Sequence, residues 1–144
     1  MIAYISVGVD DMERAKRFYL SFMPALEYDM EESAEGLSFV LRPQEHATFL
    51  FPEFYVKPTF NGQPATAGNG TMIAFDARRQ QQVRELHAAA LAAGGQDEGP
   101  PGFRERYGPN FFVAYLRDPQ GNKIALFADD PSEPNRDGVS APAA

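Results

Sequence analysis

Near the start of the chain apolar positions alternate with mixed ones, and the spacing of apolar residues then becomes helical. In residues 1–9 (MIAYISVGV) the odd-numbered positions from Ile5 to Val9 are apolar, whereas the even-numbered positions from Tyr4 onward are mixed. Residues 10–26 (DDMERAKRFYLSFMPAL) then place apolar side chains on one stripe of a helix. The pattern predicts a strand that leads into an amphipathic helix.

The ends of this helix and the next three segments are also marked in the sequence. Asp10 or Asp11 is a candidate N-cap, and Pro24 is a stop signal. Three β-like segments follow, at residues 26–32, 37–43 and 47–56, the last with Pro52 at an edge position or a bulge. The first half of the chain therefore reads βαβββ.

The same order starts again after a loop rich in Pro, Gly and Asn. Residues 71–77 predict a strand, and residues 78–95 predict a helix that ends at a glycine pair. After a Gly/Pro-rich passage, two more strands are expected at residues 110–118 and 121–127, joined by a tight turn. We expect an α+β fold of two βαβββ modules, at residues 1–57 and 71–128, with a connecting loop at 58–70 and a disordered tail at 129–144.

One face of each predicted strand is apolar and the other is mixed. Ile73 and Phe75 oppose Met72 and Ala74, and the last strand repeats this arrangement. Helices that cover the apolar faces would lie on the convex side of a cup-shaped mixed sheet. The mixed faces would then line a concave space that suits a small ligand.

Composition narrows the possible partners and the compartment. A net charge of -7 without a Lys/Arg cluster argues against nucleic acid and acidic membranes as partners. The absence of cysteine excludes disulfides and thiolate chemistry, and no apolar run reaches the length of a membrane span. We expect a cytoplasmic protein.

Four stretches resemble the glyoxalase/bleomycin-resistance/dioxygenase superfamily, whose members are also called vicinal oxygen chelate proteins. They are VGVDDMERAKRFYLSFMPAL, PEFYVKPTFNGQPATAGNGT, IAFDARRQQQVRELHAAALAAGG and YGPNFFVAYLRDPQGNKIALF. The resemblance covers residues 1 to about 127. It implies paired βαβββ modules in a cup-shaped sheet, which a homodimer often completes.

The resemblance also implies a divalent metal bound by His and Glu on equivalent strands, and the matching positions here differ. They hold Tyr4, Met72, Ala125 and, before the Pro-Asn pair, Gly108. A protonated phenol, a soft thioether and a methyl group are poor ligands for hard divalent ions. We therefore predict no metal site and no cofactor.

Other residues offer only weak substitutes for this site. His46 is interpreted as a solvated loop residue, His87 as an exposed or rim residue, and Glu53 as an edge charge. Residues 104–107 (RERY) have the charge to hold an anion, but a solvated strand end is the favoured interpretation. No serine lies in a nucleophile-elbow motif, and GNG at 68–70 does not connect a strand to a helix.

The favoured hypothesis is metal-free binding of a small aromatic or cationic molecule in the sheet cavity. Its candidate ligand-binding residues are Tyr4, Met72, Phe54, Tyr55, Tyr107, Asn110 and Phe112. The alternative is a metal-dependent enzyme, similar to lactoylglutathione lyase or a dioxygenase, with a relocated metal site. A remnant without any ligand is the third possibility.

Overall fold

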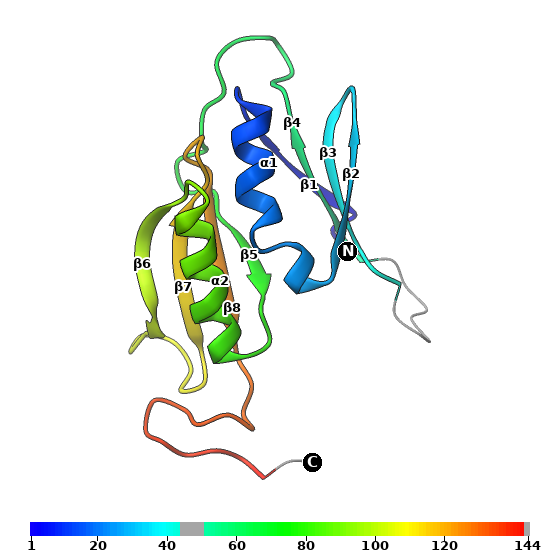
Figure 1. Cartoon of the computed structure of the whole chain (residues 1–144). Helices are drawn as coiled ribbons and strands as arrows, with labels where there is room; N and C mark the ends of the chain where they lie inside the picture. Colours follow the sequence, from blue (N-terminus) through cyan, green and yellow to red (C-terminus); the bar gives the residue numbers. More distant parts are fainter. Residues whose placement is uncertain (44–50, 143–144) are drawn as a thin grey trace.

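The computed structural model describes residues 1–43 and 51–142 and contains two four-stranded sheets (Figure 1). In chain order the elements are β1 (Tyr4–Gly8), α1 (Met12–Leu20), the 3₁₀ helix η1 (Pro24–Leu26), β2 (Tyr28–Ser33), β3 (Gly36–Leu41), β4 (Glu53–Lys57), β5 (Ile73–Asp76), α2 (Gln80–Ala92), β6 (Gln96–Phe103), β7 (Phe112–Arg117) and β8 (Lys123–Ala128). The strand orders are β1-β4-β3-β2 and β5-β8-β7-β6. The predicted pair of βαβββ modules is confirmed.

Both sheets are mixed, and each keeps one open face. β1 is parallel to β4 and β5 is parallel to β8, while the other pairs are antiparallel. As predicted, Ile73 and Phe75 are buried beneath the second sheet, whereas Met72 and Ala74 are exposed on its other side. Within the described ranges no strand of one sheet pairs with a strand of the other.

Helix α1 begins where the sequence predicts and ends earlier. The Asp11 carboxylate accepts the backbone N–H of Arg14 at 3.0 Å, which identifies Asp11 as the N-cap. The helix stops at Leu20, where the hydroxyl of Ser21 donates to the carbonyl of Phe18 at 2.5 Å. Pro24 does not end the α-helix but starts η1, because its fixed φ suits a first helical position.

The two modules share one hydrophobic core, which surrounds α1. Figure 1 shows α1 between the two sheets, with α2 packed on β7 and β8. The ring centroid of Phe75 in β5 lies 5.9 Å from that of Phe22 and 5.3 Å from that of Phe54. In the part of the chain that the structure describes, no helix is long and apolar enough to cross a membrane.

Strand β6 was not predicted, because its sequence, QDEGPPGF, is that of a loop. It pairs with β7 at the edge of the second sheet, with register shifts between Asp97 and Gly99 and between Gly99 and Gly102. These bulges and the edge position accommodate Pro100 and Pro101, which lack the N–H that a central strand needs. A strand was predicted at residues 47–56, and β4 confirms the second part of it. Residues 47–50 lie outside the described residues.

The predicted disorder of the tail stays a prediction; residues 129–142 leave β8 and extend beyond the lower end of the second module in Figure 1. The Glu133 carboxylate accepts the backbone N–H of Gln80 at 2.9 Å, at the start of α2, where Arg79 provides no side-chain cap. Arg136 donates to the carbonyls of Glu105 and Tyr107 at 3.0 and 3.3 Å. The tail is therefore attached by hydrogen bonds to backbone groups of residues 80, 105 and 107, and not by the burial of apolar side chains.

Candidate functional site

A hollow of about 670 Å³ lies on the open face of the second sheet, and we call it the basic hollow. Its wall and floor come from three parts of the chain. They are the loop before β5 (Ala67, Gly68, Asn69, Gly70, Thr71 and Met72), the segment after β6 (Arg106 and Tyr107), and strands β7 and β8 (Tyr115, Arg117 and Lys123). The volume is within the range of small-molecule pockets, roughly 300–1,000 Å³.

Strand alternation and aromatic contacts set the shape of the basic hollow. Tyr115 faces the same side as Ala125, its partner on β8. Residues 104–111 fold back over this side, where the ring of Phe111 lies 5.0 Å from that of Tyr107 and stacks at 5.5 Å on that of Phe127. The aromatic contacts therefore hold Tyr107 at the rim.

The loop before β5 turns sharply at Gly68 to Thr71. The backbone N–H of Thr71 donates to the carbonyl of Gly68 at 3.1 Å, and Gly70 has φ +99°, a conformation that disfavours residues with a Cβ. This turn brings Asn69 and Thr71 to the hollow beside Met72.

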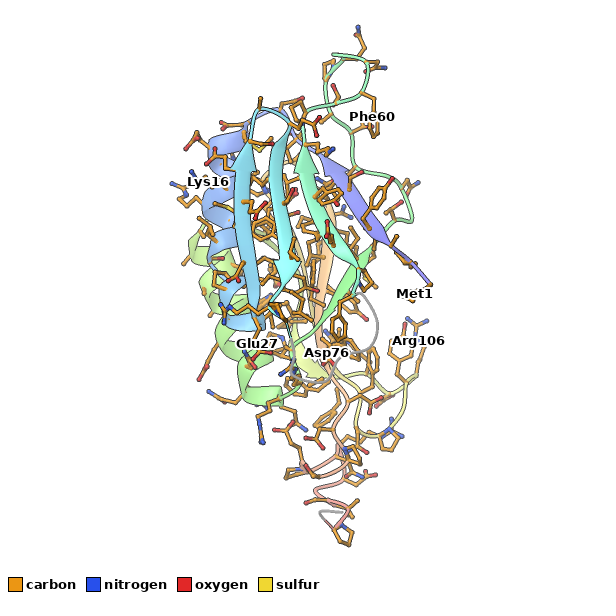
Figure 2. All side chains as sticks on the ribbon, turned by 90° about the vertical axis from the view of Figure 1, so that its right-hand side faces the viewer. Met1, Lys16, Glu27, Phe60, Asp76 and Arg106 are labelled. Carbon is orange, nitrogen blue, oxygen red and sulfur yellow. The ribbon has the colours of Figure 1, made fainter. Side chains whose placement is uncertain are left out.

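Three cationic side chains line the basic hollow: Arg106, Arg117 and Lys123. Arg117 is neutralised, because its Nε lies 2.5 Å from Oε1 of Glu98, and it also donates to the carbonyl of Gly121 at 2.8 Å. Among the described residues, no carboxylate lies within 4 Å of the charged groups of Arg106 or Lys123. Figure 2 shows Arg106 extending from its segment at the edge of the molecule.

Tyr115 lies close to two cations and keeps its proton at neutral pH. Burial raises the pKa of its hydroxyl above the ordinary value, the Tyr107 hydroxyl adds to this effect, and the Arg104 guanidinium opposes it. Arg104 and Lys123 lie over its ring, 5.4 and 5.2 Å from the centroid. A protonated phenol next to a hollow is available as a hydrogen-bond donor.

The open face of the first sheet carries a different set of side chains (Figure 2). The rings of Tyr4 and Tyr55 lie 5.3 Å apart, and the Tyr55 hydroxyl donates to the Glu53 carboxylate. That hydrogen bond raises the pKa of Tyr55. A second hollow of about 350 Å³ lies beside β1 under the loop of residues 58–66, whose exposed Phe60 is labelled in Figure 2.

Comparison with known proteins places this duplicated fold in one family. The sequence model described as Glyoxalase/Bleomycin resistance protein/Dioxygenase superfamily matches residues 1–126. The chain belongs to this superfamily. The crystal structure of a superfamily relative, a glyoxalase/bleomycin resistance protein from Albidiferax ferrireducens T118, is 35% identical and covers 89% of this chain and 98% of its own, with a TM-score of 0.72.

Two more distant structures of the superfamily share the fold. A glyoxalase-related enzyme from Fulvimarina pelagi is 22% identical, covers 100% of this chain and 99% of its own, and has a TM-score of 0.66. A glyoxalase/bleomycin resistance protein/dioxygenase family enzyme from Burkholderia phytofirmans PsJN is 17% identical, covers 88% and 97%, and has a TM-score of 0.61. No curated protein matches the chain significantly.

The residues present do not fit the metal of the superfamily's metal-binding members. Tyr4 and Met72 are exposed on the faces of separate sheets, and Ala125 is only 1% exposed between Ala74 and Tyr115. A buried methyl group offers neither a donor atom nor access. Within residues 1–43 and 51–142, no group of three or more His, Cys, Asp or Glu side chains is placed to hold a metal ion.

The substitute ligands are separated as well. The prediction that His87 is exposed or at a rim was wrong: the side chain is 6% exposed on α2, and its Nε2 lies 3.2 Å from Oδ1 of Asp97 on β6. Glu53 is bound to the Tyr55 hydroxyl, and His46 lies outside the described residues.

The structure divides the seven residues predicted from the sequence to bind a ligand. Met72 and Tyr107 line the basic hollow, whereas Tyr4 and Tyr55 lie on the face of the other sheet. Phe54 and Phe112 are 3% and 2% exposed within the core, on the faces that the helices cover. The Asn110 amide donates to the tail carbonyls of Asp130 and Glu133.

Sequence reasoning missed Tyr115, Arg117, Lys123 and the donors of the loop before β5. Two signals were available in the sequence. Strand alternation places Lys123 and Ala125 on one face, and the RERY segment at residues 104–107 carries two arginines. Arg106 of that segment lines a hollow and does not simply end a strand.

Proposed function

We propose that this chain binds a small organic molecule with an aromatic ring in the basic hollow, and that no metal takes part in the binding. The observation that carries the proposal is the composition of the hollow. Tyr107, Tyr115 and Met72 provide apolar and polarisable surface, and Met72 occupies a position where the family resemblance implies a histidine ligand.

The polar groups of the hollow suit recognition by hydrogen bonds. The Thr71 hydroxyl, the Asn69 amide and the Tyr115 hydroxyl line the same space, so a ring between the tyrosines has donors along its edge. A few convergent polar groups in an apolar wall are typical of small-molecule sites.

A cationic ligand, one of the two kinds in the favoured hypothesis, does not suit this hollow, because the positive charges of Arg106 and Lys123 repel it. A cation fits the first sheet better, where Glu53 lies next to the paired rings of Tyr4 and Tyr55. That face has aromatic rings but is open to solvent. We therefore favour the aromatic ligand in the second module.

The test is a titration of the full chain with 2-naphthol, a neutral aromatic probe, followed by amide NMR shifts and calorimetry. Shifts are expected to concentrate in residues 67–72, 106–107 and 115–123. Tyr107→Ala should weaken binding, since it removes one aromatic wall, and Phe60→Ala is the matched control, because Phe60 is 96% exposed outside the hollow. Shifts that concentrate elsewhere, or no saturable binding of any naphthalene probe, would overturn the proposal.

A further inference from the structure

We infer that the molecule bound in the basic hollow carries an anionic group, a carboxylate or a phosphate, which Arg106 and Lys123 bind. This inference rests on the proposed function and names the chemical class of its ligand. It follows from the distribution of charge in the molecule and from the ion pairs that its basic side chains make.

The lining of the basic hollow has the opposite charge to the protein as a whole. The chain carries 20 acidic and 13 basic residues, with a net charge of -7. Nevertheless, the described lining of the hollow includes three basic side chains and no acidic one. Such a concentration of positive charge gives an anion a place of favourable potential on a protein whose net charge is negative.

Five basic side chains among the described residues are paired with carboxylates. Lys16 pairs with Glu32 at 2.6 Å, Arg42 with Asp29 at 2.9 Å, Arg78 with Glu27 at 2.8 Å and Arg117 with Glu98 at 2.5 Å. Arg106 and Lys123 face the hollow without such a partner among the described residues. Their charge is therefore available to a ligand.

Contacts on both sides of the hollow place these two cations. The Lys123 ammonium lies over the Tyr115 ring, and the segment that carries Arg106 is fixed by Arg136, which binds the carbonyls on either side of it. The guanidinium offers a planar fork to a carboxylate or phosphate, whereas the ammonium acts as a point charge. The neutral donors of Thr71 and Tyr115 complete an anion-binding wall.

The second hollow provides an internal comparison. Lys57 is the charged side chain of its described lining, and its Nζ lies 3.6 Å from the Glu35 carboxylate. Positive charge without a carboxylate partner therefore distinguishes the basic hollow from this second hollow.

The experiment compares three probes that share one ring system and differ in charge: 2-naphthoate, 2-naphthol and 2-naphthylmethylammonium. We expect 2-naphthoate to bind about tenfold more tightly than 2-naphthol, because a hydrogen bond to a charged group contributes about 1.5 kcal/mol. The ammonium probe should bind more weakly than the alcohol. The preference for naphthoate should fall when NaCl is raised, since the cations are open to solvent. 2-Naphthyl phosphate distinguishes the two anions, and tighter binding of either one than of the alcohol supports the inference.

Paired variants assign the effect to these residues. The double variant Arg106→Gln/Lys123→Gln should bind 2-naphthoate and 2-naphthol about equally, while Arg14→Gln on the exposed side of α1 removes one charge elsewhere and should keep the preference. Thermal unfolding confirms that both variants fold. Equal binding of anion and alcohol by the wild type, or a preference that survives the double variant, would overturn this inference and leave the proposed function standing. Failure of all the probes to bind would overturn both.

Discussion

The hydroxyl of Tyr19 donates a hydrogen bond of 2.7 Å to the carboxylate of Asp118, and this fully buried contact joins the helix of the first module to a turn of the second. The other Asp118 oxygen accepts the backbone N–H groups of Gln120, Gly121 and Asn122. The turn motif RDPQGN thus has a structural role in this chain, since its aspartate closes the turn and connects the modules.

Tyr19→Phe should lower the free energy of unfolding by about 1–2 kcal/mol, because it leaves one oxygen of a buried carboxylate with one donor fewer. Urea unfolding followed by circular dichroism measures the change. Tyr28→Phe is the control, since no hydrogen bond of the Tyr28 hydroxyl is found among the described residues, and it should change stability by less than about 0.5 kcal/mol. Equal effects of the two substitutions would contradict a specific role for the Tyr19 hydroxyl.

The same hydrogen bond predicts alkaline destabilisation. Burial, with the charge of Asp118 next, raises the pKa of Tyr19 well above the ordinary value of 10.0. Above pH 10 the unfolded chain therefore loses this proton while the folded chain keeps it, so stability is full below pH 10 and falls as pH rises further. Unfolding free energies measured from pH 8 to 11 should fall more steeply for the wild type than for Tyr19→Phe. Parallel curves would show that Tyr19 does not contribute.

Ala125→Glu restores the carboxylate that the family resemblance implies, and we expect it to destabilise the fold by about 3 kcal/mol, because a buried charge without a partner is costly. Ala74→Glu is the matched control, since Ala74 pairs with Ala125 in the sheet and is exposed. Chemical unfolding should separate the two variants clearly. If Ala125→Glu leaves the free energy of unfolding unchanged, the side chain at this position must reach solvent.

Metal titration tests the metal-dependent alternative directly. We expect no stoichiometric binding of Zn²⁺, Ni²⁺, Mn²⁺ or Fe²⁺ by calorimetry, because Tyr4, Met72 and Ala125 provide no ligand suited to these ions. One tightly bound ion per chain, lost on substitution of His46, His87 or Glu53, would instead establish a relocated site and support the enzyme hypothesis.

The hydrogen bond from the backbone N–H of Gln80 to the Glu133 carboxylate should stabilise the start of α2 measurably. Glu133→Ala should lower the free energy of unfolding by about 1 kcal/mol, because the N–H of Gln80 loses its acceptor. Asp137→Ala removes a charge from the same tail, where only the backbone N–H of Asp137 makes a hydrogen bond in the described structure. If Asp137→Ala proves as destabilising as Glu133→Ala, general tail charge and not capping is responsible.

The homodimer expected from the family resemblance remains a prediction. Met1, Ile2 and Tyr4 are 95%, 60% and 62% exposed at the start of the chain, so this apolar edge would be covered by association. Light scattering coupled to size-exclusion chromatography should give about twice the mass of 15.9 kDa. Tyr4→Glu should shift the mass toward that of one chain, and a monomeric wild type would contradict the expectation.

Local patterns predicted most of the fold, because the buried faces of strands and helices show in the sequence as alternating or helically spaced apolar residues. The βαβββ order of the first module, a helix cap at Asp10 or Asp11, and the buried faces of β5 and β8 were all predicted from residues close in sequence. Strand β6 was missed because its pairing depends on β7 and on bulges around two prolines. The end of α1 was misplaced because a serine three residues earlier than the proline already satisfied the last turn.

The site was less predictable than the fold, since it is assembled from residues distant in sequence. Phe54 and Phe112 were expected to line a cavity, yet strand alternation turns them toward the helices, whereas Tyr55 and Tyr115 face outward. The basic character of the hollow depends on how residues 104–111 fold over β7 and β8. Composition alone indicated the opposite charge.

The contacts of the 118–122 turn also show how the first module depends on the second. Besides the bond to Tyr19, Asn122 donates to the carbonyl of Gly8 at 3.1 Å, and the amide oxygen of Gln120 accepts the N–H of Asp10 at 2.8 Å. The second half of the gene thus encodes the groups that satisfy the end of the first half's leading strand. A first module separated from the second would therefore leave the carbonyl of Gly8 and the N–H of Asp10 without these partners.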